Sequence, residues 1–528
     1  MTNKPEIGAA TAMRFVGIVV AIVLLFSSAH SFAARALDIS TNAQSTADHS
    51  QFEVLKQKFQ TGPEVTKACL SCHTKAAKQL HETKHWKWEY KNPKTGQTVG
   101  KKHVVNNFCI SASPNIAACS SCHIGYGWKD DSFDFASEEN VDCLVCHDTT
   151  TTYSKTKLRE GGKRKLNLSK IAQSIGKTSR TTCGACHFSG GGGKAVKHGD
   201  MDPSLNHPDY FVDVHMDADG LNFSCSTCHT SDQHEVAGSR YAPTAADTAG
   251  IDVPGKTVGG RASCVSCHST EPHPEENHPK LNDHTDRVAC QTCHIPRLSR
   301  GDFANKTWWD WSTAGKMADD GSVLHKFDES GHEIYNSKKG DFVWKEWVKP
   351  EYAWFNGTVR YNLVGDQINP NKIVPINMIE GGADDAQARI WPFKVMRGKQ
   401  PYDSVKNSLV TVKTTGKTGF WTTFDWPSGI QQGMDLVKKP YSGKFGFVET
   451  EMHWPITHMV APPNEAVSCN ECHAKDSLLK DLTGFYMPGR DSFAWLSQLG
   501  WLAAALSLLG VLVHMALRIF LGMRNGRK

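Results

Sequence analysis

Cysteine and histidine recur along the chain in one fixed pattern. Two cysteines separated by two residues are followed at once by a histidine, and this occurs eight times. The spacing is typical of c-type haem attachment, in which the thiols bond the haem vinyl groups and the histidine binds the iron. We therefore predict eight covalently bound c-type haems (Fe), attached through Cys69, Cys72, Cys119, Cys122, Cys143, Cys146, Cys183, Cys186, Cys225, Cys228, Cys264, Cys267, Cys290, Cys293, Cys469 and Cys472. The corresponding iron ligands are His73, His123, His147, His187, His229, His268, His294 and His473.

Other uses of these cysteines fit the pattern less well. Sixteen of the 17 cysteines belong to the motifs, and only Cys109 stands outside them. Zinc would need matched ligand pairs in tetrahedral sets, whereas here a histidine follows every pair. A disulfide framework is also disfavoured, because cysteines two residues apart usually form redox or metal sites. The pattern therefore indicates a redox protein that transfers electrons.

The segments between the motifs predict how these residues are positioned. Glycine, threonine and proline are frequent there, so only short helices and loops are expected around each motif. Hydrophobic residues make up 39% of the 528 residues, and eight buried porphyrins would supply much of the missing apolar core. We predict a mainly α and irregular multihaem cytochrome c fold packed around eight haems. The formal charge of +5 gives no indication of nucleic-acid binding.

Motif spacing divides the expected haem domain, residues 37–491. Seven motifs lie in 69–294, none in 295–468, and the eighth occupies 469–473. The motif-free segment is rich in tryptophan, and we favour ordinary core packing over tryptophans that line haem faces. Strand-like runs such as 358–364 indicate some irregular α/β character in this segment.

Both ends of the chain carry apolar segments. Residues 1–36 read as a signal peptide with a small-residue cleavage site, and an uncleaved anchor is the alternative. Residues 493–520 are long and apolar enough for a transmembrane anchor, and the basic residues of 521–528 predict a cytoplasmic tail. The haem domain is thus expected on the periplasmic side. His514 lies within the anchor, as an intramembrane functional residue or an interfacial one.

Several longer runs resemble a known family. The runs 61–73, 122–130, 214–217, 281–285, 454–460 and 483–491 resemble the tetrathionate reductase family of octahaem cytochromes c. This family is similar to a wider group of multihaem nitrite and hydroxylamine enzymes. The resemblance covers residues from about 48 to 491 and leaves out the membrane segment.

The resemblance implies seven haems closed by two histidines and one open haem. The far-side ligands that match best are His85, His198, His215, His234, His273, His284 and His458. Of the remaining histidines, His30, His49 and His514 are set aside because they lie in the signal, the polar arm and the membrane segment. The alternatives to the chosen set are His81, His103, His207, His278, His325, His332 and His453.

The resemblance also implies a lysine at the open haem. Lys129, six residues after His123, is the first candidate, either replacing His123 or lying opposite it; an ordinary solvated lysine is the alternative. Lys197 is the main rival, and Lys155, Lys157 and Lys163 are weaker ones. Cys109, the second candidate catalytic residue, could exchange with a sulfur substrate or could be a small buried hydrophobe.

Two functions remain open. The first, implied by the resemblance, is a membrane-anchored oxidoreductase with a small inorganic anion as substrate. It would reduce tetrathionate to thiosulfate, with nitrite or hydroxylamine as further candidates. A quinone-linked or cytochrome electron donor is expected as its partner. The second is an electron conduit in which every iron is closed.

Overall fold

The computed structural model describes residues 47–108, 110–155, 166–191, 193–246, 262–274, 276, 279–301 and 303–525. Thr46–Lys528 forms one compact unit. The predicted signal peptide, Cys109, Lys157, Lys163 and the end of the predicted tail lie outside the described residues.

Short helices carry the attachment motifs. Three of them, α10 (Arg180–His187), α11 (Cys225–Cys228) and α17 (Cys469–Cys472), follow a serine whose backbone N–H donates to a side chain three residues later, on Thr182, Thr227 and Glu471. This bond satisfies a backbone donor at the helix start and so favours a turn at the cysteines. The other helices described within residues 49–294 are η1 (His49–Gln51), α2 (Glu53–Lys56), α3 (Gly62–Leu70), α4 (Ala76–Glu82), α5 (Lys84–Lys87), η2 (Ser113–Asn115), α6 (Ile116–Cys119), η3 (Ser120–Cys122), η4 (Glu138–Asn140), α7 (Leu144–His147), α9 (Leu168–Gln173), η5 (Pro203–Asn206), α12 (Val265–His268), α13 (Pro279–Thr285) and α14 (Cys290–His294).

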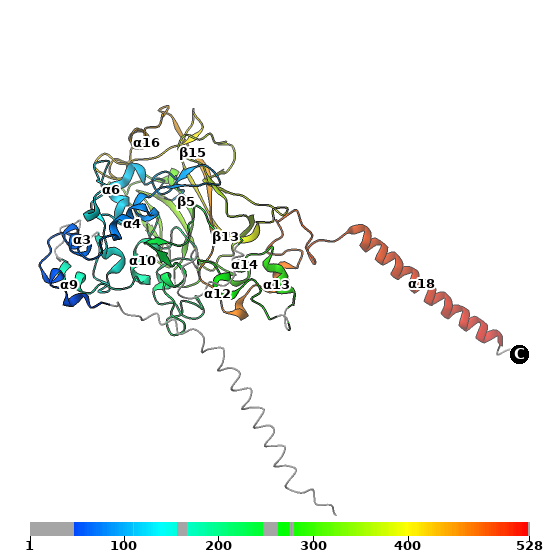
Figure 1. Cartoon of the computed structure of the whole chain (residues 1–528). Helices are drawn as coiled ribbons and strands as arrows, with labels where there is room; N and C mark the ends of the chain where they lie inside the picture. The colour runs from blue at the N-terminus through cyan, green and yellow to red at the C-terminus, as the bar shows by residue number, and fades with distance from the viewer. Residues whose placement is uncertain are drawn as a thin grey trace, which may run out of the picture. The chain divides into compact units, whose positions relative to one another are not determined.

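A nine-stranded mixed sheet fills the segment without motifs (Figure 1). Its order is β11-β15-β13-β5-β8-β7-β6, with β9 and β14 also paired to β13. The long strand β13 runs antiparallel to β15, from Phe393 opposite Pro455 to Asp403 opposite Phe445. The strands are β5 (Asn305–Asp310), β6 (His325–Phe327), β7 (Glu333–Asn336), β8 (Gly340–Lys345), β9 (Glu351–Phe355), β11 (Val374–Pro375), β13 (Arg389–Asp403), β14 (Ser408–Leu409) and β15 (Phe445–Pro455).

This sheet corrects the expected fold class. The half with seven motifs is helical and irregular as predicted, but the motif-free segment is built mainly of strands. Two-stranded pairs are formed by β1 (Tyr90–Lys91) with β2 (Thr98–Val99), β3 (Ser231–Asp232) with β4 (Glu235–Val236), and β10 (Val359–Tyr361) with β12 (Asn377–Ile379). The strand-like run 358–364 thus contains a real strand, β10.

Aromatic side chains of the motif-free segment make the largest described core. Trp309 and Trp311 are fully buried, and their rings stack with centres 5.0 Å apart. Trp391 and Trp454 belong to the same buried cluster, whereas Trp347 is 56% exposed. Core packing, the favoured interpretation of the tryptophans, is confirmed for these four. In addition to its strands, the segment contains η6 (Trp311–Thr313), α15 (Phe420–Thr423), α16 (Trp426–Leu436) and η7 (Pro463–Glu465).

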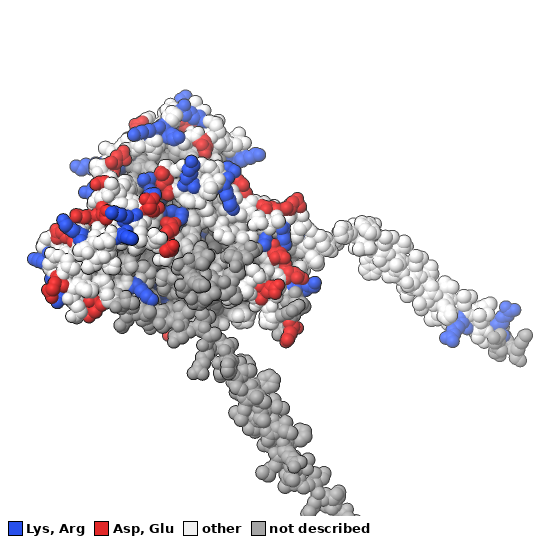
Figure 2. All heavy atoms as spheres, in the orientation of Figure 1, with Lys and Arg blue, Asp and Glu red and all other residues white. Residues whose placement is uncertain are grey.

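A long apolar helix follows the last motif. α18 (Ala494–Asn525) contains one segment, Ala494–Arg524, that is long and apolar enough to cross a membrane. Figure 2 shows this helix without charge except near its C-terminal end. Just before it, the chain returns to the eighth motif, where Nδ1 of His473 lies 3.0 Å from the Pro488 carbonyl oxygen. A Cβ on Gly489 would lie 2.2 Å from the His473 carbonyl oxygen, so only glycine fits there.

Candidate haem-binding sites

Six motif histidines face a second histidine from elsewhere in the chain. Their ring centres lie 5.9 to 6.4 Å apart, in the pairs His73–His49, His187–His85, His229–His458, His268–His215, His294–His273 and His473–His284. An iron bound by two imidazoles at about 2 Å each separates the ring centres by about 6 Å, since each centre lies about 1 Å behind its nitrogen. The residues therefore fit six haems that are closed on both sides.

A seventh pair is indicated by electrostatics. The pKa of His234 is lowered first by burial and then by the charges of His147 and His73, so His234 lies close to the third motif. Its Nδ1 lies 2.8 Å from Oε1 of Gln79, which leaves Nε2 for an iron.

The pairs correct the predicted ligand set at one position. His198, predicted as a far-side ligand, packs its ring against Trp454 at 4.7 Å and faces no described motif histidine. His49, which had been set aside with the polar arm, lies instead against His73. The other six predicted histidines, His85, His215, His234, His273, His284 and His458, each lie near a motif histidine.

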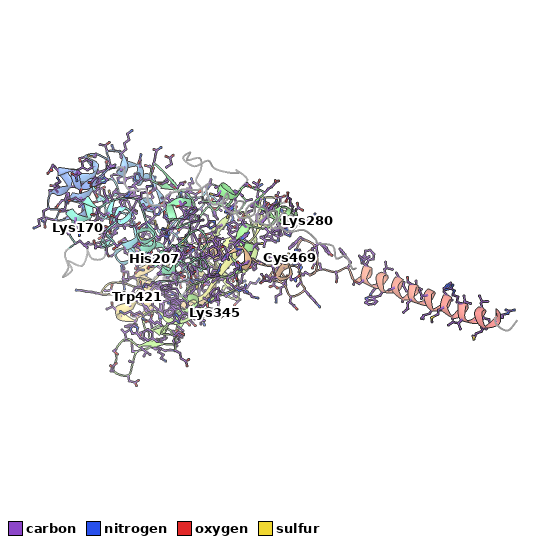
Figure 3. The ribbon with its side chains drawn as sticks, turned by 90° about the horizontal axis from the view of Figure 1, so that it is seen from below. Lys170, His207, Lys280, Lys345, Trp421 and Cys469 are labelled. Atoms are coloured by element: carbon purple, nitrogen blue, oxygen red, sulfur yellow. The ribbon has the colours of Figure 1, made fainter. Side chains whose placement is uncertain are left out.

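Cysteines of different motifs lie next to one another and give the spatial order of the sites. Thiols are within hydrogen-bond reach in four pairs: Cys69–Cys143, Cys122–Cys186, Cys183–Cys225 and Cys264–Cys290. Three further pairs are close enough to interact electrostatically: Cys146–Cys183, Cys228–Cys264 and Cys293–Cys472. The motifs thus follow the order first, third, fourth, fifth, sixth, seventh, eighth, and the second branches from the fourth. In Figure 3, Lys170, from α9 beside the first motif, lies on the side away from α18, and Cys469 of the eighth motif lies on the side toward α18.

The second motif differs from the others. The His123 ring is fully buried among aromatic rings, and its Nε2 lies 2.7 Å from the Trp86 carbonyl oxygen. Its Nδ1 accepts a hydrogen bond from the Gly125 N–H at 3.0 Å. Both ring nitrogens are therefore engaged by protein, and no second histidine ring packs against His123 among the described residues.

The lysines near this motif are placed differently from the prediction. Lys129 is exposed and lies beside the exposed Asp130, while the preceding Trp128 is buried. The buried lysine is Lys155, whose amine donates to the carbonyl oxygens of His123 and Gly125. The first candidate is thus corrected: the structure brings Lys155, one of the weaker alternatives, to the second motif.

A second group of cations lies on the cysteine side of this motif. Lys101 and Lys197 act electrostatically on the Cys122 thiol, and burial, together with Arg240 and Lys101, lowers the pKa of Lys197 well below its usual range. The Lys197 amine and the Arg240 guanidinium lie 5.3 and 4.5 Å from the centre of the Trp454 ring. None of these three cations forms an ion pair with a described carboxylate, so the arrangement favours an anion.

Comparisons with known proteins also indicate a c-type cytochrome. The family model "Cytochrome c554 and c-prime" matches residues 68–148, and "Cytochrome c bacterial" matches 306–476. An uncharacterized protein of Archaeoglobus fulgidus is 27% identical over 243 residues, which cover 36% of this chain and 80% of that protein. The crystal structure of octaheme cytochrome c from Shewanella oneidensis is 44% identical, with a TM-score of 0.72, and the match covers 81% of this chain and 94% of that one.

These matches and the histidine pairs define a multihaem cytochrome c. The chain belongs to the octahaem cytochromes c, because the match to the Shewanella oneidensis protein spans nearly all of that protein.

Proposed function

We propose that the chain is an exported, membrane-anchored octahaem reductase. Each motif would hold one haem, with seven irons closed by the pairs described above and the second motif holding the reactive one. The observation that carries this proposal is the engagement of both His123 ring nitrogens by protein groups, unlike the paired histidines of the other motifs. The haems would carry low-potential electrons from one motif to the next, in the order given above, to the fourth motif, from which the second branches.

Lys155 is the residue that we assign to the iron of the second motif. Binding requires the neutral amine, and burial of a lysine favours that form. Asp142, 3.9 Å from the Lys155 amine, would favour the charged form, but burial raises the pKa of that carboxyl and so weakens the effect. Lys197 remains the alternative, from the opposite group of cations.

The cation group formed by Lys101, Lys197 and Arg240 would hold the substrate anion. Tetrathionate would take up two electrons, its central sulfur–sulfur bond would break, and two thiosulfates would leave. Nitrite and hydroxylamine are further candidates, and their reduction also consumes protons. Cys109, which lies outside the described residues, stays a candidate for exchange with a sulfur substrate.

The membrane part of the proposal rests on α18. Its length and composition suit a single-pass anchor, with the haem-binding unit on the periplasmic side and a quinone-linked or cytochrome donor as partner. The runner-up function, a pure electron conduit, would need every iron to be closed.

The decisive experiment compares Lys155→Ala with Lys129→Ala in the full haem-loaded chain. Lys155→Ala should change the absorption and magnetic resonance signals of one haem and lower tetrathionate turnover with a reduced artificial donor. Lys129→Ala, at an exposed lysine, should change neither. An unchanged Lys155→Ala protein together with an altered Lys197→Ala protein would move the role to Lys197. Eight low-spin haems that ignore added ligand in the unsubstituted protein would refute the reductase and favour the conduit.

A further inference from the structure

A buried carboxylate contacts one of the paired histidines. Oδ2 of Asp200 accepts hydrogen bonds from the backbone N–H groups of Thr457 and His458, at 2.7 and 2.9 Å, and lies 3.0 Å from Nδ1 of His458. Asp200 is completely buried. Two backbone N–H groups and the His458 ring thus face one carboxylate oxygen, an arrangement that favours the carboxylate over the protonated acid.

The other histidines of the seven pairs make different contacts. Where a described Nδ1 has a partner, that partner is a neutral oxygen: the carbonyl oxygens of Gly176, Ala237, Lys280 and Pro488 for His147, His229, His284 and His473, and the amide oxygens of Gln79 and Asn282 for His234 and His273. Asp213 lies 3.9 Å from Nδ1 of His215, beyond a hydrogen bond. Among the described pairs, a hydrogen bond to a carboxylate thus distinguishes the fifth motif.

Other charged groups around Asp200 lie farther away. Nδ1 of His198 is 3.8 Å from Oδ1 of Asp200. The Lys394 amine acts on Asp200 electrostatically, but donates its described hydrogen bonds to the carbonyl oxygens of Val196 and Lys197. Two side chains are hydrogen-bonded to Asp200: the His458 ring at 3.0 Å and the Thr457 hydroxyl at 3.5 Å. That hydroxyl also lies 3.1 Å from Nδ1 of His458, so Asp200 is the charged one of the two groups beside this nitrogen.

A carboxylate that accepts the Nδ1 proton makes an imidazole a stronger donor to its metal. A stronger donor and a nearby negative charge both stabilise the ferric state over the ferrous state. We propose that Asp200 lowers the reduction potential of the haem held between His229 and His458, and so acts as a positioning and tuning residue. The inference rests on the axial pairing in the proposed function.

The position of this haem determines which electron transfer a lowered reduction potential would favour. The fifth motif lies between the sixth and the fourth, directly before the branch to the second, because Cys225 and Cys183 are neighbours. An electron that arrives from the C-terminal motifs would leave a low-potential haem readily, so Asp200 would favour onward transfer over storage at this point.

The test exchanges the acceptor at two equivalent places. Asp200→Asn replaces the carboxylate with an amide, and Asn282→Asp does the reverse beside His273, whose Nδ1 lies 3.2 Å from the Asn282 amide oxygen. Spectropotentiometry of the haem-loaded chain, followed by magnetic resonance, should show one haem shifted to higher potential in the first protein and one shifted to lower potential in the second. A tenfold change in the ratio of ferric to ferrous haem corresponds to about 59 mV for one electron, and we expect at least this.

The outcomes separate the tuning from the pairing. His458→Met should alter one low-spin signal; if it alters none, the pairing itself is wrong. An altered signal in His458→Met with unshifted potentials in both acceptor variants would overturn the tuning alone. Should Asp200→Asn fail to load haem, a missing downward shift in Asn282→Asp would still count against the inference.

Discussion

Replacing His49 gives the sharpest test of the paired histidines. This residue lies in η1, where the Asp48 carboxylate accepts a hydrogen bond from the Ser50 N–H at 3.0 Å and holds the turn. The ring centres of His49 and His73 are 6.4 Å apart, so an iron midway between them would have two imidazole bonds of about 2 Å. Nδ1 of His49 is buried without a hydrogen-bond partner among the described residues, which leaves a nitrogen to bind.

His49→Ala should therefore open one haem and leave the other closed haems unchanged. The number of ferrous haems that bind carbon monoxide should rise from one to two in each chain, measured as the amplitude of the carbon monoxide difference spectrum. His198→Ala is the matched control, because His198 was predicted as a ligand but packs against Trp454. A count that stays at one in His49→Ala, or that rises in His198→Ala, would refute the assignment.

Two further predictions concern the C-terminal part of the chain. A chain that ends at Asp491 should be soluble, haem-loaded and active with an artificial donor; firm membrane binding of this protein after signal cleavage would show that α18 is not the anchor. Gly489→Ala should lower the melting temperature more than Gly443→Ala. Both glycines have positive φ, 85° and 83°, and share that strain, but only at Gly489 does the new Cβ meet backbone atoms, so the difference should be about 1–3 kcal/mol. Equal losses would contradict the contact with His473.

The sequence predicts the attachment sites from spacing alone, because both thiols and the first ligand are close together in the chain, and the eight sites stay a prediction. It could not predict which histidine serves which motif. His85 follows the first motif by a dozen residues yet lies against His187 of the fourth, and only the fold brings them together. His49 was missed because its neighbours are polar and give no signal that this turn packs near the first motif.

The sheet was hard to predict for a different reason. β13 is buried on both faces over most of its length, so its residues show no alternation of polar and apolar side chains. β15 does alternate, with Val448, Thr450, Met452 and Trp454 buried, but a single strand gives no sheet. After the second motif, Trp128 is buried and the adjacent Lys129 is exposed, which spacing from His123 could not show. The buried Lys155 comes from a segment after the third motif, so only the fold brings it to His123.

The contact between His473 and the segment before α18 keeps the eighth motif close to the start of that helix. Pro488 touches His473, and α18 begins at Ala494, six residues later, a distance that an extended chain covers in at most about 20 Å. With α18 in a bilayer, the eighth motif could not drift far from the lipid surface, whereas the first motif lies at the other end of the order. Electron carriers dissolved in the lipid would then reach the eighth motif, and water-soluble electron carriers would reach the first motif.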